Sequence, residues 1–187
     1  LEATRRALGG NFVVAVLLCY LLLVVIFTHW GYPLVILVTV PLGIAGGIVG
    51  LWLLNAVGSL LPILGLAAIR QPFDMITMLG FLILLGTVVN NPILVVDESL
   101  QRLKEGGVSV TEAVTAAVDS RLRPIMMTTI TTVCGLAPLV LIPGAGTELY
   151  RGVGAVVLGG LVSATALTLT FLPALLVPLL EWQQRRA

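Results

Sequence analysis

Four polar positions inside apolar stretches are the candidates for chemistry in this sequence. Asn90 and Asn91 interrupt the run TVVNNPILVV, and Arg121 and Thr128 belong to the segment SRLRPIMMTT. Amide, guanidinium and hydroxyl groups exchange hydrogen bonds with one another and with water. Unpartnered polar groups are costly in hydrocarbon, and these side chains are therefore expected to face other helices or a water-filled path.

The spacing along two helices predicts that these groups meet. Asn90 lies seven residues before Asp97, where its apolar run ends, and Thr128 lies seven residues after Arg121. At about 1.5 Å per residue, both positions are roughly 10 Å from the same membrane surface. Seven residues is close to two turns, so Arg121 and Thr128 share a helix face. If the two helices are neighbours, a polar stripe runs from the surface towards the middle of the membrane.

Pro92 directly follows the two asparagines. Inside a helix it cannot donate to the carbonyl of Val88, and its ring disfavours a straight helix. The freed carbonyl needs a partner from a side chain, a neighbouring helix or water. We therefore predict a kink beside Asn90 and Asn91, at a site that changes shape. The alternative is that the asparagines and threonines only connect helices, through hydrogen bonds that are common and modest in membranes.

The composition identifies the membrane as the solvent of this chain. Of its 187 residues, 58% are hydrophobic and 10% are charged, and the mean hydropathy is +1.11. Soluble domains carry about 25% charged residues. Five apolar stretches approach or exceed the roughly 20 residues that cross a bilayer, and we predict spans at residues 11–28, 33–54, 75–97, 122–142 and 153–180. The expected fold is an all-α, five-helix transmembrane bundle.

The segments between the spans are assigned from their composition. Residues 55–74 contain Pro62 and Gly65 and are too broken for a sixth span, so we expect an interfacial hairpin or short helix. Residues 98–121 are predicted to form a loop and an interfacial amphipathic helix, because Ser109 and Glu112 have the spacing of a capping box. The remaining segments are assigned as an extracytoplasmic lead-in, a periplasmic loop and a cytoplasmic tail: residues 1–10, 143–152 and 181–187.

Basic residues orient the predicted spans. Six of the ten Lys and Arg lie between the third and fourth spans or after the fifth: Arg102, Lys104, Arg121, Arg123, Arg185 and Arg186. The positive-inside rule places these segments in the cytoplasm and the start of the chain outside it. Asp97 and Arg123 are interpreted as anchors at the membrane surface. Because the first residue is Leu rather than Met, we expect the chain to be part of a longer protein whose outer domain precedes it.

Glycines in two spans are predicted to serve helix packing. Gly43, Gly46, Gly47 and Gly50 include two GxxxG pairs, and the fifth span contains GGLVSA at residues 159–164. Small residues at this spacing allow helix backbones to approach closely in lipid.

Other kinds of site find little support. His29 is the only histidine and has no partner at metal-ligand spacing, and Cys19 and Cys134 form no CxxC motif. The segment GAGTELYRGVG lacks the GK[ST] of a phosphate loop. The net charge of +1 shows no basic patch for nucleic acid. An enzyme is therefore not expected.

Three segments carry a resemblance to a known family: LGFLILLGTVVNNPILVVDES, EAVTAAVDSRLRPIMMTTITTVCGLAPL and GAGTELYRGVGAVVLGGLVSATALTLTFLPAL. Their order, and above all the stretch from Arg121 to Leu139, resembles the last membrane helices of the resistance-nodulation-division (RND) efflux pumps, in the drug-efflux branch. The resemblance implies that the five spans are helices eight to twelve of a twelve-helix transporter in the bacterial inner membrane. The N-terminal half and the periplasmic domains would lie in a preceding part of the same pump.

The family exchanges substrates for protons, which pass through two aspartates of an earlier helix and polar residues of helices ten and eleven. On this resemblance Asn90, Arg121 and Thr128 are proton-relay residues, with Asn91 and Pro92 in second rank. Asn90 stands where well-known drug pumps carry a lysine, and Pro92 where a small residue is expected. We expect coupling to be retained with an amide at position 90.

The resemblance also implies partners and an energy source. They are a homotrimer, a periplasmic adaptor protein, an outer-membrane channel and the lipid bilayer, with no nucleic acid and no cofactor besides the proton motive force. Drugs or other amphiphiles are the expected substrates. Two alternatives remain open: a member of the superfamily that exports lipids or metals or acts in protein secretion, and a non-transport module whose helices anchor or sense.

Overall fold

The computed structural model describes residues 2–60, 69–142 and 146–185, with side chains from residue 9 onward. This part of the chain contains five helices and no strand. They are α1 (Glu2–Phe27), α2 (Gly31–Leu60), α3 (Met75–Glu105), α4 (Val110–Leu141) and α5 (Thr147–Gln184). Each contains a stretch long and apolar enough to cross a membrane. The predicted all-α, multi-pass bundle is confirmed.

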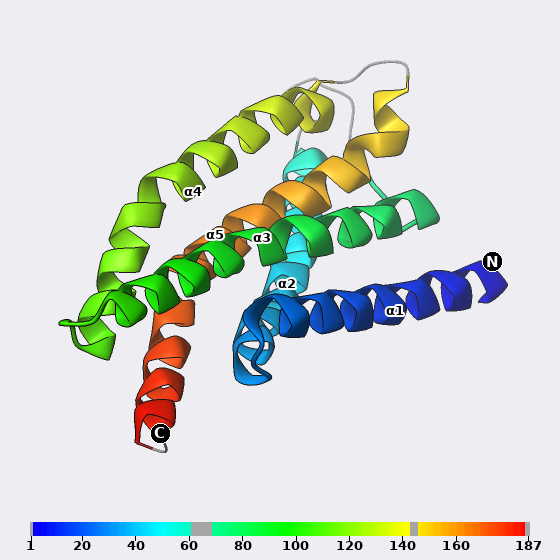
Figure 1. Cartoon of the computed structure of the whole chain (residues 1–187). Helices are drawn as coiled ribbons and strands as arrows, with labels where there is room; N and C mark the ends of the chain where they lie inside the picture. Colours follow the sequence, from blue (N-terminus) through cyan, green and yellow to red (C-terminus); the bar gives the residue numbers. More distant parts are fainter. Residues whose placement is uncertain (1, 61–68, 143–145, 186–187) are drawn as a thin grey trace.

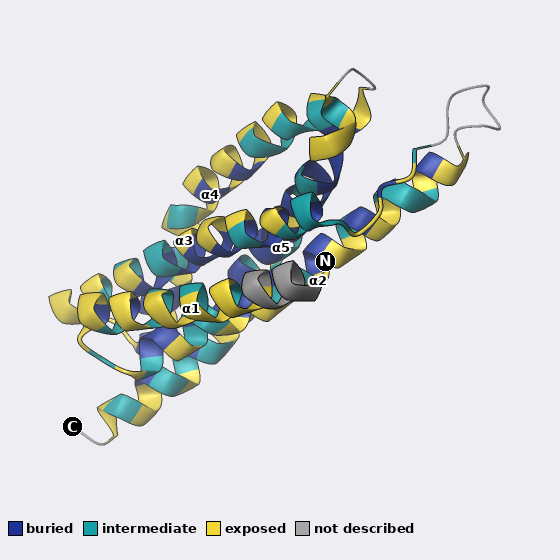
Figure 2. Ribbon diagram, turned by 90° about the vertical axis from the view of Figure 1, so that its right-hand side faces the viewer, coloured by how far each residue is buried: buried dark blue, intermediate teal, exposed yellow. Residues whose placement is uncertain are grey.

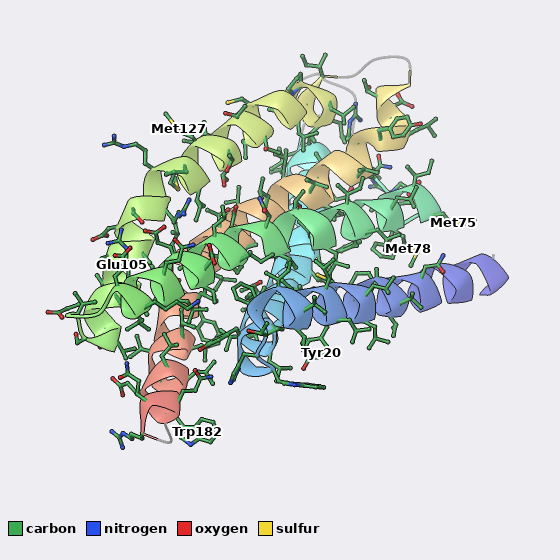
Figure 3. The ribbon with its side chains drawn as sticks, in the orientation of Figure 1. Tyr20, Met75, Met78, Glu105, Met127 and Trp182 are labelled. Atoms are coloured by element: carbon green, nitrogen blue, oxygen red, sulfur yellow. The ribbon has the colours of Figure 1, made fainter. Side chains whose placement is uncertain are left out.

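Helix α5 is the centre of the bundle. It contacts α2, α3 and α4, whereas α1 contacts only α2 and α3 at the edge (Figure 1). Buried residues concentrate along α3 and α5, whereas most of the α1 residues from residue 9 onward are exposed (Figure 2). Met75 and Glu105 lie at the two ends of α3, and Met127 lies on the outer side of α4 (Figure 3).

Close contact between α2 and α5 rests on glycine, as the sequence predicts. A Cβ atom added to Gly159 would lie 2.5 Å from the Cα atom of Gly50 and 2.6 Å from the carbonyl oxygen of Gly46. One added to Gly50 would lie 2.6 Å from the carbonyl oxygen of Ala155. The two backbones therefore touch, and dispersion contacts between them hold the bundle together where lipid offers no hydrophobic driving force.

Several helices extend beyond the predicted spans. Residues 2–10, expected as a lead-in, belong to α1, and residues 55–60, expected in an interfacial hairpin, belong to α2. Helix α5 begins at Thr147 and ends at Gln184. Apolar length predicts what crosses the bilayer, but a helix continues until a cap or a break ends it. Residues 61–68 and 143–145, parts of the predicted hairpin and periplasmic loop, lie outside the described residues.

The connection between α3 and α4 is shorter than predicted. Helix α3 continues to Glu105, and Gly106 and Gly107 end it with φ angles of 78° and 83°, which favour glycine. The capping box is present, because Ser109 Oγ accepts the Glu112 N–H (3.3 Å) and Glu112 Oε2 accepts the Ser109 N–H (2.9 Å). The predicted amphipathic helix is thus the first turns of α4, and one continuous helix carries both Arg121 and Thr128.

Asp74 caps the start of α3, where its Oδ1 atom accepts the Thr77 N–H at 2.8 Å. Burial raises the pKa of Asp74, but hydrogen bonds from the backbone and side chain of Thr77 outweigh it, so the pKa lies below its usual value. Asp74→Ala is expected to destabilise the purified protein by about 1 kcal/mol in thermal unfolding. Asp74→Asn keeps a capping oxygen and is the control.

The lowered pKa fixes the sign of the pH dependence. The charge of Asp74 stabilises the fold above its unfolded-state pKa of about 3.9, and this contribution is lost as the pH falls through the folded-state value. We therefore expect the wild type to be more stable than Asp74→Asn at neutral pH and the two to converge in acid. A difference that stays constant between neutral and acidic pH would contradict this account.

Candidate functional site

A groove between α3 and α4 collects most of the polar residues singled out in the sequence. Its volume is about 280 Å³, room for several water molecules. Both helices contribute to its lining: Gly86, Thr87, Asn90 and Asn91 come from α3, Thr128, Thr129 and Thr132 from α4, and Leu161 from α5. The structure therefore brings Asn90, Asn91 and Thr128 together, as the matched depths of the two helices predict.

The two asparagines occupy different positions in this groove. Asn90 is exposed to it, whereas Asn91 is 7% exposed and lies against the buried side of α3. One turn before Asn90, a Cβ atom added to Gly86 would meet no atom within 4 Å. The groove therefore stays open beside the amide of Asn90, which can donate and accept hydrogen bonds there.

Thr128 and Thr132 satisfy their hydroxyl hydrogens within α4. Thr128 Oγ1 donates to the carbonyl of Ile125 at 3.0 Å, and Thr132 Oγ1 donates to the carbonyl of Thr128 at 2.9 Å. A hydroxyl that donates to its own helix keeps its oxygen lone pairs as acceptors. At these two positions the groove lining can therefore accept a hydrogen bond from water.

Thr129 differs, because it connects two helices. Its Oγ1 atom lies 3.0 Å from Oγ1 of Thr165 on α5, and both side chains are buried. For this threonine the structure supports the alternative in which hydroxyls only hold helices together. Sequence reasoning missed Thr165, because helical spacing shows which residues share a face but not which helix they meet.

Arg121 lies outside the groove and pairs with a residue that sequence reasoning missed. Its Nη2 atom is 2.8 Å from Oε2 of Glu98 on α3, and Glu98 also pairs with Arg102 at 2.9 Å. Asp97, the expected surface anchor, is exposed and accepts a hydrogen bond from Gln101 at 2.8 Å. The sequence does hold one signal for Glu98, its i to i+4 spacing from Arg102, which pairs opposite charges on one helix. That spacing does not identify Arg121 as a second partner.

Pro92 does not interrupt α3, which runs from Met75 to Glu105 as one helix. The proline is buried beside Asn91. The predicted kink stays a prediction. Among the described residues, no group of three or more His, Cys, Asp or Glu side chains could hold a metal ion.

Known proteins resemble this chain along nearly its whole length. The AcrB/AcrD/AcrF family matches residues 3–179. The multidrug resistance protein MdtC of Salmonella paratyphi A (strain ATCC 9150 / SARB42) is 35% identical over 161 residues, 86% of this chain and 14% of the relative. The chain therefore spans only a small part of the curated relatives that it matches.

Solved structures of a heavy metal efflux pump share the fold. Crystal form II superimposes with a TM-score of 0.71 at 30% identity, over 95% of this chain and 16% of the pump. Crystal form I gives 0.67 at 31% identity, over 91% of this chain and 15% of the pump.

Proposed function

Because this chain belongs to the AcrB/AcrD/AcrF family of RND efflux transporters, we propose that it forms the last five membrane helices of a pump that exchanges an amphiphilic substrate for protons. The complete transporter would add the N-terminal helices and periplasmic domains, since the chain spans 14% of MdtC. A bacterial inner-membrane location, a homotrimer, an adaptor protein and an outer-membrane channel belong to the same proposal. The energy source is the proton motive force, without a cofactor.

One observation carries this proposal: the polar groove between two otherwise apolar helices. Asn90, Asn91 and Thr128 surround a space that admits water, and polar groups in spanning helices characteristically line ion and proton paths. Acidic groups that load and release protons would come from an earlier helix and face this groove. Asn90 supports the path by hydrogen bonding, because an amide does not titrate.

The open groove also argues against the main alternative to transport, a module that does not transport. A module that only anchors or senses predicts that the polar stripe is sealed by side-chain pairs. Such a pair occurs at Thr129 and Thr165, but Asn90 remains exposed in an open groove. The open groove at Asn90 therefore favours a water-filled path over a polar stripe that is closed by side-chain pairs.

The substrate class has two candidates. The similarity to MdtC, a multidrug resistance protein, favours drugs, and the neutral amides of Asn90 and Asn91 agree with the drug-efflux branch. The similarity in fold to a heavy metal efflux pump favours heavy metal ions instead. Efflux assays with a fluorescent dye and with a divalent metal would distinguish the two classes.

Thr128 offers the direct test of the proton path. In the complete transporter, Thr128→Val is expected to lower proton-driven dye efflux about tenfold or more, because the oxygen that accepts water's proton is lost. Thr131→Val is the matched control, since Thr131 is exposed, donates to the carbonyl of Met127 and lies outside the groove lining. Efflux should be normalised to the membrane level of each variant. Normal efflux by Thr128→Val would remove this residue from the path.

A further inference from the structure

His29, the only histidine of the chain, connects the turn between α1 and α2 to the end of α5. Helix α1 ends at Phe27 and α2 begins at Gly31, so the turn is three residues long. His29 Nδ1 accepts the Gly31 N–H at 3.0 Å. Gln183 of α5 places its side-chain nitrogen 3.1 Å from His29 Nε2. Each ring nitrogen of His29 therefore contacts a different element of the bundle.

Packing holds the imidazole ring in this position. A Cβ atom added to Gly31 would lie 3.3 Å from His29 Nδ1 and 3.4 Å from Leu179 Cδ1 of α5. The ring centroids of His29 and Tyr32 are 4.8 Å apart, and Tyr32 is buried. The Tyr32 hydroxyl lies 2.5 Å from Oε1 of Gln183. We call His29, Gly31, Tyr32 and Gln183 the His29 cluster.

The charge of His29 follows from these contacts. A backbone N–H can only donate, so Nδ1 carries no proton, and a neutral imidazole then carries its proton on Nε2. With its oxygen on Tyr32, the Gln183 amide would present its NH2 group to Nε2–H, donor to donor. A half-turn of this amide presents its oxygen to Nε2–H and its NH2 group to the Tyr32 hydroxyl oxygen instead. His29 is thus neutral in this arrangement, with a partner for each ring nitrogen.

A proton added to His29 disrupts the arrangement. Imidazolium carries an N–H on both nitrogens, so Nδ1 no longer accepts the Gly31 N–H and the two donors repel each other. The positive charge would also lie at the start of α2, where the helix dipole disfavours a cation. The rigid ring must rotate to separate Nδ1 from Gly31, and this rotation moves Nε2 away from Gln183.

No carboxylate of the described residues compensates such a charge. Helix α2 contains no charged residue, and neither does α1 from residue 9 onward. On α5, Glu181 and Arg185 are exposed, and the ion pairs of the described chain lie elsewhere. The other titratable groups of α1 and α2 are two hydroxyls and a thiol: Tyr20, Tyr32 and Cys19. Among the described residues of these helices, His29 is therefore the group that changes charge between about pH 5 and 8.

Protons can reach His29, because its side chain is only half-buried and lies in a turn between two spans. The positive-inside rule orients this turn and the end of α5 toward the cytoplasm. We propose that the His29 cluster is a pH-sensitive contact, which holds the end of α5 against the α1–α2 turn while His29 is neutral and releases it in an acidic cytoplasm. Because α5 lines the groove at Leu161, its release would also change the groove. The proposal goes beyond the proton path and does not depend on it.

Hydrogen–deuterium exchange of the complete transporter tests this contact at about pH 8 and about pH 5, with a correction for the intrinsic rate at each pH. In the wild type, residues 28–34 and 178–184 should exchange severalfold faster in acid, because the Gly31 N–H and the end of α5 lose their partners. In His29→Asn, the side-chain oxygen replaces Nδ1 as the acceptor and cannot titrate. Neither segment of this variant should respond to pH.

Gln183→Met separates the two ends of the contact. The substitution removes the partner on α5 but leaves His29 in its turn. Residues 178–184 should therefore exchange fast at both pH values, while residues 28–34 keep their response to acid. Gln184→Met, at the exposed neighbouring residue, is the matched control and should behave like the wild type.

Three results would overturn the proposal. The first is equal exchange of the wild type at both pH values, and the second is an acid response of His29→Asn that equals that of the wild type. The third is a wild-type response confined to residues 28–34, which would mean that α5 is not released. If His29→Asn does not accumulate, the uncharged His29→Gln takes its place with the same expected result.

Discussion

Gly159→Ala is expected to destabilise the bundle by more than about 3 kcal/mol, at or beyond the upper end of the usual cost of overpacking. The new methyl group would lie 2.5 Å from the Cα atom of Gly50 and 2.6 Å from the carbonyl oxygen of Gly46. Backbone atoms cannot rotate away as a side-chain end can, so α2 must separate from α5. Because α5 also contacts α3 and α4, the displacement would spread to both walls of the groove.

Thermal unfolding and protease resistance of the purified protein measure this effect. Gly135→Ala is the matched control, since a Cβ atom at Gly135 in α4 would meet no atom within 4 Å. Alanine is a better helix former than glycine by about 1 kcal/mol, so this variant should be slightly more stable than the wild type. The two substitutions are chemically identical and should have opposite signs. Equal stability of both variants would show that the backbones of α2 and α5 do not touch.

Arg121→Ala should abolish proton-coupled efflux while leaving most of the stability intact. The Arg121 and Glu98 side chains are 32% and 19% exposed, and a pair that water reaches contributes only about 1 kcal/mol or less. A group that acts in proton transfer typically contributes a factor of about a hundred or more. Efflux driven by an imposed pH gradient in vesicles, compared with the Tm of the same preparation, measures the two effects separately.

The Glu98→Gln variant distinguishes a role of Arg121 in the proton relay from a purely structural role. The substitution removes the negative partner of Arg121 but keeps its size and one acceptor oxygen. If Arg121 only ties α3 to α4, Glu98→Gln and Arg121→Ala should lower efflux equally. If Arg121 acts on protons entering or leaving the groove, Glu98→Gln should retain much more efflux. Equal losses would assign Arg121 to the architecture.

The candidate site shows what helical spacing can predict from the sequence and what it cannot. Counting turns from Asp97 and from Arg121 placed Asn90 and Thr128 at one depth, and the two line one groove. The same counting could not find Glu98 as the partner of Arg121. Asp97 and Glu98 are adjacent acids, but they lie about 100° apart around α3, and only Glu98 faces α4.

The sequence by itself determined the class of protein, the five membrane-spanning helices, the capping box at Ser109 and the family. These properties depend on apolar length, local spacing and motifs, all of which are read along one chain. The tertiary structure decided that α5 is central, that Thr129 meets Thr165 and that Arg121 pairs with Glu98 across α3 and α4. Such contacts join residues far apart in sequence. Periodicity shows that a helix has a polar face, but only packing decides which side chains that face meets.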